Sequence, residues 1–252
     1  MIGYVCVLST DNYLNGILVL NENLKALKSR YNLLCIINEK ISENSKIQLE
    51  KHHIPYVELP SIPYVVKHKS HWNNTFDKLN IFLLEGYKKI IYLDADLLLL
   101  ENIDFLFDYN TPAMVIDRPS HTDKYNSGLM VISPSKQVFD ELLKLKKHHE
   151  LENSVIGDQD ILNEYYKTIQ VVRIADRYNV IRTILNEKVV RINHLTKKEE
   201  EVYKVIKNSL APNPACIHYV GNNKPFTIDN FYDDEYAHLY YYYYALVKNK
   251  KL

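Results

Sequence analysis

Hydrophobic and polar positions along the chain follow two periods that replace one another. Short apolar runs rich in β-branched residues predict strands, and longer segments with apolar residues at helical spacing predict helices. The run Val5–Leu8 predicts a first strand, and Tyr13–Lys28 predicts the helix that follows the turn Ser9–Asn12. This alternation is typical of an α/β fold, in which helices flank a mixed, mostly parallel sheet.

The same pattern predicts the remaining elements. Further strands are expected at Leu33–Ile37, Pro55–Leu59, Lys89–Leu93, Ala113–Ile116, Leu129–Ile132, Ile169–Arg173 and Ala215–Tyr219. Further helices are expected at Ser42–His52, Phe76–Gly86, Lys136–His149 and Asp158–Lys167. The run Tyr240–Tyr244 is expected to pack a terminal helix against the body of the protein, and Lys197–Glu201 to face solvent. For 252 residues with 46% hydrophobic content, we expect one domain, residues 1–252.

Charge and cysteine content narrow the class of protein. Lys plus Arg and Asp plus Glu both number 31, so no field of one sign covers the molecule and nucleic acid is a poor partner. Cys6, Cys35 and Cys216 each lie in an apolar run, which favours buried free thiols in a reducing compartment over a disulfide framework. The opening run lacks a basic flank and is too short to span a membrane. We therefore expect a cytoplasmic protein without a membrane span.

Two carboxylates stand directly after the strand predicted at Lys89–Leu93. Asp94 and Asp96 are separated by one residue, so both can turn oxygens to one site if the chain bends there. Mg²⁺ and Mn²⁺ prefer oxygen donors and complete their coordination with substrate phosphates. Asp is also common in exposed turns, so the triplet alone leaves metal binding and a strand-to-loop turn as alternatives.

Three further polar clusters flank predicted elements. His218 ends a strand, and Gly221 and Lys224 follow it; this combination suits a third metal ligand, a close backbone approach to phosphate and a positive charge against it. His218 taken by itself fits a structural histidine bonded to a carbonyl group equally well. The segments Tyr125–Gly128, before a strand, and Gly157–Asp160, at the start of a helix, each also fit a turn or a cap.

Together and in this order, the clusters resemble glycosyltransferase family 8, the family of glycogenin, galactinol synthase and bacterial lipopolysaccharide galactosyl- and glucosyltransferases. The matching segments span roughly residues 3 to 230. They are Ser9-Thr10-Asp11-Asn12-Tyr13-x-x-Gly16, Lys78-Leu79, Leu93-Asp94-Ala95-Asp96, Asn102-Ile103-Asp104-x-Leu106-Phe107, Asn126-Ser127-Gly128, Gly157-Asp158-Gln159-Asp160 and His218-x-x-Gly221-x-x-Lys224-Pro225. Any one of them could arise by chance, whereas the ordered set is specific.

The resemblance implies a GT-A fold and a retaining, metal-dependent transfer of a hexose, glucose or galactose, from a UDP-sugar to an acceptor hydroxyl. It implies Mn²⁺, with Mg²⁺ as the alternative, bound by Asp94, Asp96 and His218. The residues expected to bind the donor are Val7, Ser9, Thr10 and Tyr13 at base and ribose, Lys78, Gly221 and Lys224 at the diphosphate beside Asp94-Ala95-Asp96 and His218, and Asn126, Ser127, Asp158 and Gln159 at the sugar. The residues expected to be catalytic are Asp158, Gln159 and Lys224. The first two would stabilise positive charge at the anomeric carbon and the third negative charge on leaving UDP.

The acceptor side departs from glycogenin. Between Tyr178 and His218 the only tyrosine is Tyr203, so the self-glucosylated tyrosine segment of glycogenin is not matched. Phe226 stands where the family has a tryptophan. An external glycan, polyol or protein acceptor and self-glucosylation, within one chain or across a homodimer, are all kept as alternatives.

Two other classes of protein are weighed. A nucleotidyltransferase also uses an aspartate pair, but it needs a glycine-rich, basic loop after the first strand, where only Ser9–Asn12 stands. A catalytically inactive sugar-nucleotide or glycan-binding protein would share the fold, because function resides in the site and not in the fold. The presence of all three expected metal ligands, Asp94, Asp96 and His218, argues against an inactive protein.

Overall fold

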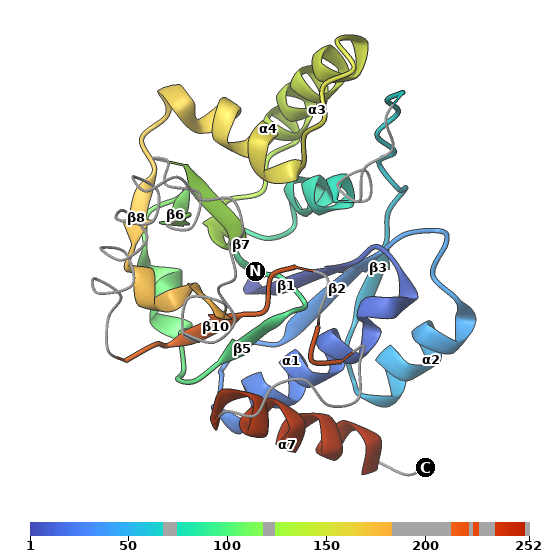
Figure 1. The fold of residues 1–252 in the computed structure, drawn as a ribbon, viewed down its shortest axis with the longest axis vertical. Helices are drawn as coiled ribbons and strands as arrows, with labels where there is room; N and C mark the ends of the chain where they lie inside the picture. Colours follow the sequence, from blue (N-terminus) through green and yellow to red (C-terminus); the bar gives the residue numbers. More distant parts are fainter. Residues whose placement is uncertain (68–74, 118–123, 183–212, 222–223, 227–234, 250–252) are drawn as a thin grey trace, which may run out of the picture.

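Seven strands form one sheet in the order β3-β2-β1-β4-β7-β6-β8 (Figure 1). The computed structural model describes residues 1–67, 75–117, 124–182, 213–221, 224–226 and 235–249. The strands are β1 (Ile2–Leu8), β2 (Leu33–Ile37), β3 (Tyr56–Glu58), β4 (Lys89–Leu93), β6 (Ala113–Ile116), β7 (Tyr125–Ile132) and β8 (Val172–Ile174). All neighbours are parallel except β7, which is antiparallel to both β4 and β6. The predicted mixed, mostly parallel sheet is confirmed.

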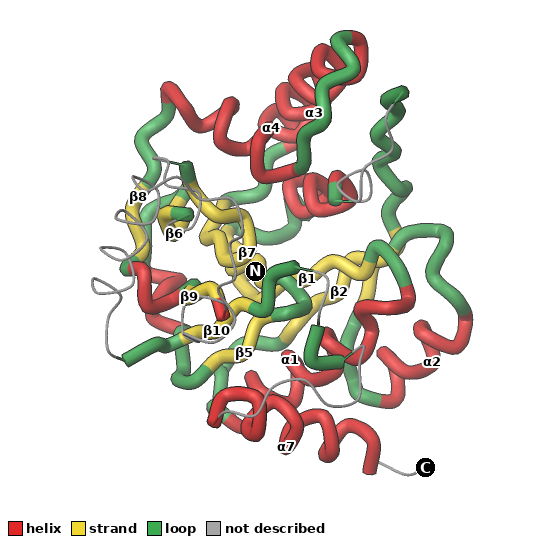
Figure 2. Tube along the Cα trace, in the orientation of Figure 1, coloured by secondary structure: helices red, strands yellow, loops and turns green. Residues whose placement is uncertain are grey.

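Helices cover both faces of this sheet. They are α1 (Leu14–Ala26), α2 (Glu43–Lys51), α3 (Lys136–Leu151), α4 (Asp158–Tyr165) and α7 (Glu235–Asn249), with 3-10 turns η1 (Asp11–Tyr13), η3 (Phe76–Leu83), η4 (Asp104–Asp108), η6 (Tyr166–Thr168) and η7 (Asp176–Tyr178). The side chains of Ser42 and Ser135 accept the backbone N–H of Ser45 and Val138, which caps α2 and α3. Figure 2 shows α1, α2 and α7 on one side of the strands and α3 and α4 on the other.

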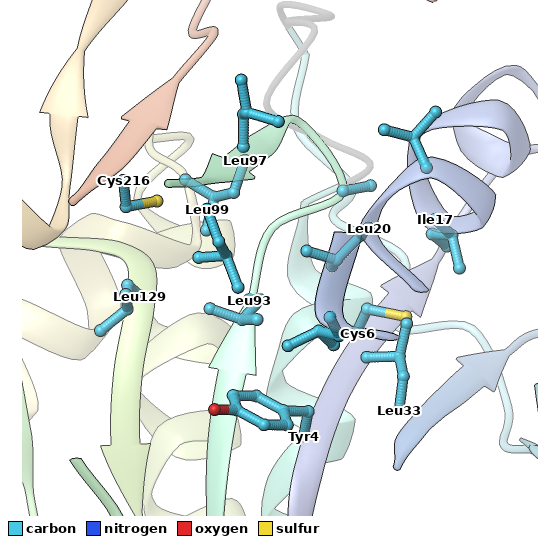
Figure 3. Packing of buried hydrophobic residues seen from close by; sticks show 14 of the residues in the cluster. Tyr4, Cys6, Ile17, Leu20, Leu33, Leu93, Leu97, Leu99, Leu129 and Cys216 are labelled. Carbon is cyan, nitrogen blue, oxygen red and sulfur yellow. The ribbon is translucent and has the colours of Figure 1, made fainter. Parts of the chain in front are cut away.

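The period of two along each strand sorts its side chains between the two faces. Tyr4 and Cys6 of β1 pack into the core under α1, α2 and α7, whereas Val5 packs into the core under η3, α3 and α4. In Figure 3, Leu93 of β4 lies in the first core, near Leu20 of α1. Burying a side chain of this size contributes about 1.5–3 kcal/mol, so both cores stabilise the sheet from which the site is built.

A second, small sheet joins distant parts of the chain. It contains β5 (Leu97–Leu99), β10 (Cys216–His218) and β9 (Val180–Ile181) in that order. Because β10 pairs antiparallel with β5, His218 lies opposite Leu97, directly after the Asp94–Asp96 segment. The small sheet therefore brings the carboxyl-terminal part of the chain to the end of β4.

Asp104 stabilises the end of the main sheet at which β2 begins. Its buried carboxylate accepts hydrogen bonds from the hydroxyls of Tyr4 and Ser29, both at 2.8 Å, and from the N–H of Arg30 at 2.9 Å. Burial raises the pKa of Asp104, but these donors outweigh it, so the pKa lies below its ordinary value. Asp104 thus fixes the segment that leads from α1 into β2.

Several predicted elements differ from the structure. The helix expected at Phe76–Gly86 is the 3-10 helix η3, which ends at Leu83. Seven of its eight residues are buried, so the helix packs on the protein on all its sides and not through a single apolar face. The strand expected at Ile169–Arg173 begins only at Val172, after the turn η6. The short strands β5 and β9 were not predicted.

The segment Tyr125–Gly128, predicted to precede a strand, lies inside β7. Its polar residues are tolerated there because they face a cavity and not the apolar core. The register of β6 against β7 also shifts between Met114 and Val115, from Met130 to Asn126, and such irregularities are common beside functional sites.

The expectations for the tyrosine run and for the cysteines are confirmed. Tyr240 and Tyr243 of α7 are buried against the body of the protein, and Tyr242 is exposed. All three cysteines are free and buried. Within the described ranges, no helix is long and apolar enough to cross a membrane. The segment Lys197–Glu201 and Tyr203 lie outside the described residues.

Candidate functional site

A cavity of about 840 Å³ opens where β1 and β4 end, a volume typical of small-molecule sites. Here the sheet order reverses, because β2 and β3 lie on one side of β1 and β4 on the other. Open α/β sheets bind ligands at such a switch point. The cavity is lined by every residue that the sequence assigned to donor and cation: Val7, Ser9, Thr10, Tyr13, Lys78, Asp94, Ala95, Asp96, Asn126, Ser127, Asp158, Gln159, His218, Gly221 and Lys224.

Three groups hold Asp94 in place after the end of β4. Its backbone N–H donates to the carbonyl of Gly128 at 2.8 Å, which continues the pairing with β7. Its carboxylate accepts from the hydroxyl of Tyr92 at 2.5 Å and lies 3.0 Å from the Nζ of Lys78. Asp94 is therefore oriented by a neutral donor and a charged one.

Asp94, Asp96 and His218 converge on one point. One ligand atom from each lies within 4.8 Å of the others. Nε2 of His218 is 3.2 Å from Oδ1 of Asp96 and 3.7 Å from Oδ2 of Asp94. A ring nitrogen this close to two carboxylates favours a positive charge between them, either a proton on Nε2 or a cation. Two oxygens and one imidazole nitrogen are a donor set that suits Mn²⁺ or Mg²⁺, so these residues fit the expected cation.

Two glycines allow this convergence. A Cβ atom at Gly128 would lie 2.4 Å from Cε1 of His218, so the imidazole can pack on β7 only because this residue lacks a side chain. A Cβ atom at Gly16 would lie 2.3 Å from the carbonyl oxygen of Ala95. Its absence lets the first turn of α1 touch the Asp94–Asp96 segment.

Lys78 links Asp94, a predicted cation ligand, to the end of the cavity that is predicted to bind the sugar. Its Nζ lies 2.9 Å from Asp158 and donates to the hydroxyl of Ser127 at 3.0 Å, in addition to its contact with Asp94. Burial lowers the pKa of Lys78, but the charges of Asp158 and Asp94 outweigh burial and raise it above its ordinary value. The same pairing lowers the pKa of Asp158, against the effect of its burial. Both groups therefore stay charged.

Lys224 plays the corresponding part at Asp96. Its Nζ donates to the Asp96 carboxylate and, at 2.8 Å, to the carbonyl of Tyr219. Burial raises the pKa of Asp96, but the charges of His218 and Lys224 outweigh it and hold the pKa below its ordinary value. The two lysines predicted to face a diphosphate thus each contact one of the two carboxylates predicted to bind the cation.

Two side-chain amides are hydrogen-bonded to their neighbours at the end of the cavity that is predicted to bind the sugar. Gln159 accepts the N–H of Ser127 at 3.1 Å and donates to Asp117 at 3.0 Å. Asn126 donates to the same Asp117 carboxylate at 3.4 Å. The oxygen of Asn126 accepts the N–H of Gly128 at 2.9 Å, so the orientation of both amides is fixed from both ends.

Tyr13 partly covers the cavity beside the end of β1. It is 38% exposed, and its ring meets Phe226 edge-on with centroids 5.6 Å apart. The Nζ of Lys224 lies 6.0 Å from the Tyr13 centroid. The phenylalanine at position 226 therefore supports the ring of Tyr13 and packs on Tyr240 of α7.

Four residues that contact the predicted site residues were not identified from sequence. Asp117 directly follows a predicted strand, the same signal that marked Asp94, and could have been found by it. The hydroxyl of Tyr92 donates to Asp94, and the hydroxyl of Thr75 accepts the N–H of Asp158 at 3.1 Å. Neither residue directly follows a predicted strand, so neither could have been found by this signal. Asn179, which contacts His218, precedes the unpredicted strand β9.

Comparisons with known proteins agree with this geometry. The family model described as Glycosyl transferase family 8 matches residues 5–228. Inositol phosphorylceramide glucuronosyltransferase 1 of Arabidopsis thaliana is 29% identical over 177 residues, 69% of this chain and 32% of that protein. Glycogenin-2 of Homo sapiens is 26% identical over 230 residues, 88% of this chain and 43% of that protein. The chain thus spans less than half the length of either relative.

Among solved structures, the galactosyltransferase LgtC in complex with donor and acceptor sugar analogs has the same fold. The TM-score is 0.67 at 20% sequence identity, covering 100% of this chain and 97% of that one. At this identity the likeness establishes the GT-A-type fold alone.

Proposed function

Because the chain belongs to glycosyl transferase family 8, we propose that it transfers a hexose, glucose or galactose, from a UDP-sugar to an acceptor hydroxyl with retention at the anomeric carbon. The observation that carries the proposal is the convergence of Asp94, Asp96 and His218, flanked by two lysines, on a cavity at the ends of β1 and β4. The relatives named above give the class of reaction, and the donor and acceptor are part of the proposal.

Charge balance supports a need for a divalent cation. When His218 is neutral, as a cation ligand must be, Asp94, Asp96 and Asp158 carry one more negative charge than Lys78 and Lys224 together supply. Both lysines already contact these carboxylates. A nucleoside diphosphate adds further negative charge to the same place. Asp94, Asp96 and His218 would hold Mn²⁺ or Mg²⁺, which offsets the charge of the diphosphate and of the departing UDP.

The lysines and Tyr13 would grip the rest of the nucleotide. Lys224 lies between the cation ligands and the ring of Tyr13, so a diphosphate beside Asp96 places the base near that ring. Tyrosine covers a flat base at little cost in conformational entropy. Val7, Ser9 and Thr10 line the same part of the cavity.

At the sugar, the arrangement favours electrostatic stabilisation over a covalent intermediate. The carboxylate of Asp158 is bonded to Lys78 and to the hydroxyl of Ser127, at 2.9 and 2.8 Å, which reduces its strength as a nucleophile. Gln159 is held by Ser127 and Asp117. Both side chains are thus suited to stabilising positive charge on the sugar ring, and front-face attack by the acceptor would account for retention.

A panel of UDP-sugars tests the proposal. We expect release of UDP from UDP-glucose or UDP-galactose that depends on Mn²⁺ and stops when EDTA removes it. Release unaffected by EDTA would refute the cation site alone. Failure of every UDP-sugar to bind would refute the function and leave the family's fold without this activity, whereas formation of a sugar nucleotide from a sugar phosphate and UTP would identify a nucleotidyltransferase.

The acceptor is tested by intact mass after incubation with UDP-sugar and Mn²⁺. Hexose increments that vanish in Tyr203→Phe would indicate self-glucosylation, and mixing an inactive with an active chain would show whether it crosses a homodimer. We favour an external glycan, polyol or protein acceptor, for which donor hydrolysis without any increment is expected. The cytoplasmic location stays a prediction, supported by the three free, buried thiols.

A further inference from the structure

The imidazole of His218 is held from the side that faces away from Asp94 and Asp96. Its Nδ1 lies 2.8 Å from Oδ1 of Asn179, while Nε2 faces the two carboxylates. Both residues are buried: His218 is 4% exposed and Asn179 is 6% exposed. Water therefore does not compete for this contact, and the partner of Nδ1 decides which ring nitrogen carries the proton.

The orientation of the Asn179 amide is fixed by a backbone group. The N–H of Gly128, which can only donate, is bonded to Oδ1 of Asn126 at 2.9 Å. The same oxygen is 2.7 Å from Nδ2 of Asn179, so Asn179 must present its NH₂ group there and its oxygen to His218. At the other end, the NH₂ group of Asn126 donates to Asp117.

This chain of bonds selects one tautomer of His218. Because Asn179 presents an oxygen, Nδ1 must carry a proton, and the lone pair of a neutral ring is then on Nε2. Turning the Asn179 amide over would put its oxygen against Oδ1 of Asn126 and its NH₂ group against Nδ1. Two buried acceptors would then face each other, which costs about 1–3 kcal/mol.

We propose that Asn179 is a positioning residue that holds His218 in the Nδ1–H tautomer, with Nε2 presented to a divalent cation between Asp94 and Asp96. The inference rests on the cation binding of the proposed function. Partners that orient a metal-bound histidine in this way change metal affinity about 10- to 100-fold when they are removed.

Mn²⁺ binding, measured by electron paramagnetic resonance without turnover, gives the first test. In Asn179→Ala we expect the Kd for Mn²⁺ to rise about 10- to 100-fold. Asn179→Asp keeps an oxygen toward Nδ1 but sets its second oxygen against Oδ1 of Asn126, so it should be less stable than the parent yet bind Mn²⁺ more tightly than Asn179→Ala. Asn21→Ala is the matched control: Asn21 is also a buried amide, it donates to the carbonyl of His52, and it does not line the cavity. An unchanged Kd in folded Asn179→Ala, or equal losses in the Ala and Asp variants, would overturn the proposal.

The tautomer itself is read by ¹⁵N NMR of labelled histidine, recorded without metal while the pH is raised until the ring signals stop changing. His218→Gln assigns the signal. We expect the Nδ1–H pattern in the parent and its loss in Asn179→Ala; an Nε2–H pattern in the parent would refute the role of Asn179. If the parent bound no Mn²⁺ yet showed the Nδ1–H pattern, the proposed cation would fail while the positioning of His218 by Asn179 stood.

Discussion

The hydroxyl of Tyr92 lies 2.5 Å from Oδ1 of Asp94, and the ring of the same tyrosine lies 5.2 Å from the Nζ of Lys78. Replacing Tyr92 by phenylalanine removes only the hydroxyl, so Lys78 keeps its ring contact. Because one of the donors that orient Asp94 is lost, we expect Mn²⁺ affinity to fall by roughly 10-fold. Titration of Mn²⁺ with UDP present measures this. Equal affinities of the two proteins would mean that Lys78 alone orients Asp94.

Asp96→Asn should abolish Mn²⁺-dependent UDP binding and turnover. It also leaves Lys224 buried without its carboxylate partner, which we expect to lower the free energy of unfolding by about 3–5 kcal/mol. Calorimetric titration and thermal unfolding measure the two effects. The double variant Asp96→Asn/Lys224→Met should recover stability without recovering binding. Cation-dependent turnover by the single variant would contradict the role of Asp96.

Gly128→Ala should displace His218, because the added Cβ would lie 2.4 Å from Cε1 and 2.9 Å from Nδ1 of the imidazole. We expect loss of cation binding with the fold retained, detected by Mn²⁺ titration beside a circular dichroism spectrum. Gly86→Ala is the control, since the nearest atom to its added Cβ is 4.0 Å away on the flexible side chain of Met1. Normal binding by Gly128→Ala would show that the site tolerates a displaced imidazole.

Tyr13→Ala should weaken UDP binding by about 1–3 kcal/mol if the ring stacks on the base. The side chain of Tyr13 is 38% exposed, so its removal should change stability less than removal of a buried tyrosine. Isothermal titration with UDP and Mn²⁺ gives the Kd. No change in Kd would make Tyr13 a structural partner of Phe226 and remove it from the base pocket.

Asp104→Asn tests the other end of the sheet. A carboxylate whose pKa is lowered by folding stabilises the protein above its unfolded pKa of about 3.9, and this contribution is lost as the pH falls through the folded pKa. We expect the variant to be about 1–3 kcal/mol less stable at neutral pH, with the difference shrinking in acid. Urea unfolding at several pH values measures it. The exposed Asp140→Asn, which loses only its Lys136 pair, should change stability by less than about 0.5 kcal/mol at neutral pH.

Sequence patterns predict the fold well where hydrophobic period decides the element. The strand expected at Leu33–Ile37 has these bounds in the structure, because both of its faces are covered and every position is apolar. The pattern fails at Tyr125–Gly128, where the polar side chains of a strand face a cavity. It also fails at β9, whose two residues are too few to show a period.

The candidate site divides in the same way. Asp94 and Asp96 can be predicted from sequence because they directly follow a clearly apolar strand. The order of the motifs assigns His218 to the same site. The role of Asn179 cannot be predicted from sequence, because it depends on a contact with His218, 39 residues away, that only the folded chain creates. Sequence thus identifies the expected ligands, and the structure adds the residues that orient them.

The small sheet that carries His218 has a consequence for biosynthesis. All strands of the main sheet precede residue 175, whereas Lys224 lies 128 residues after its partner Asp96. At about 5–20 residues per second, the ribosome delivers Lys224 on the order of 10 s after Asp96. Over that interval the emerging chain can form its main sheet but holds Asp96 without Lys224 and His218. A nucleotide and a cation bound as proposed could therefore not assist the early stages of folding, because the pocket is complete only when β10 and Lys224 have docked.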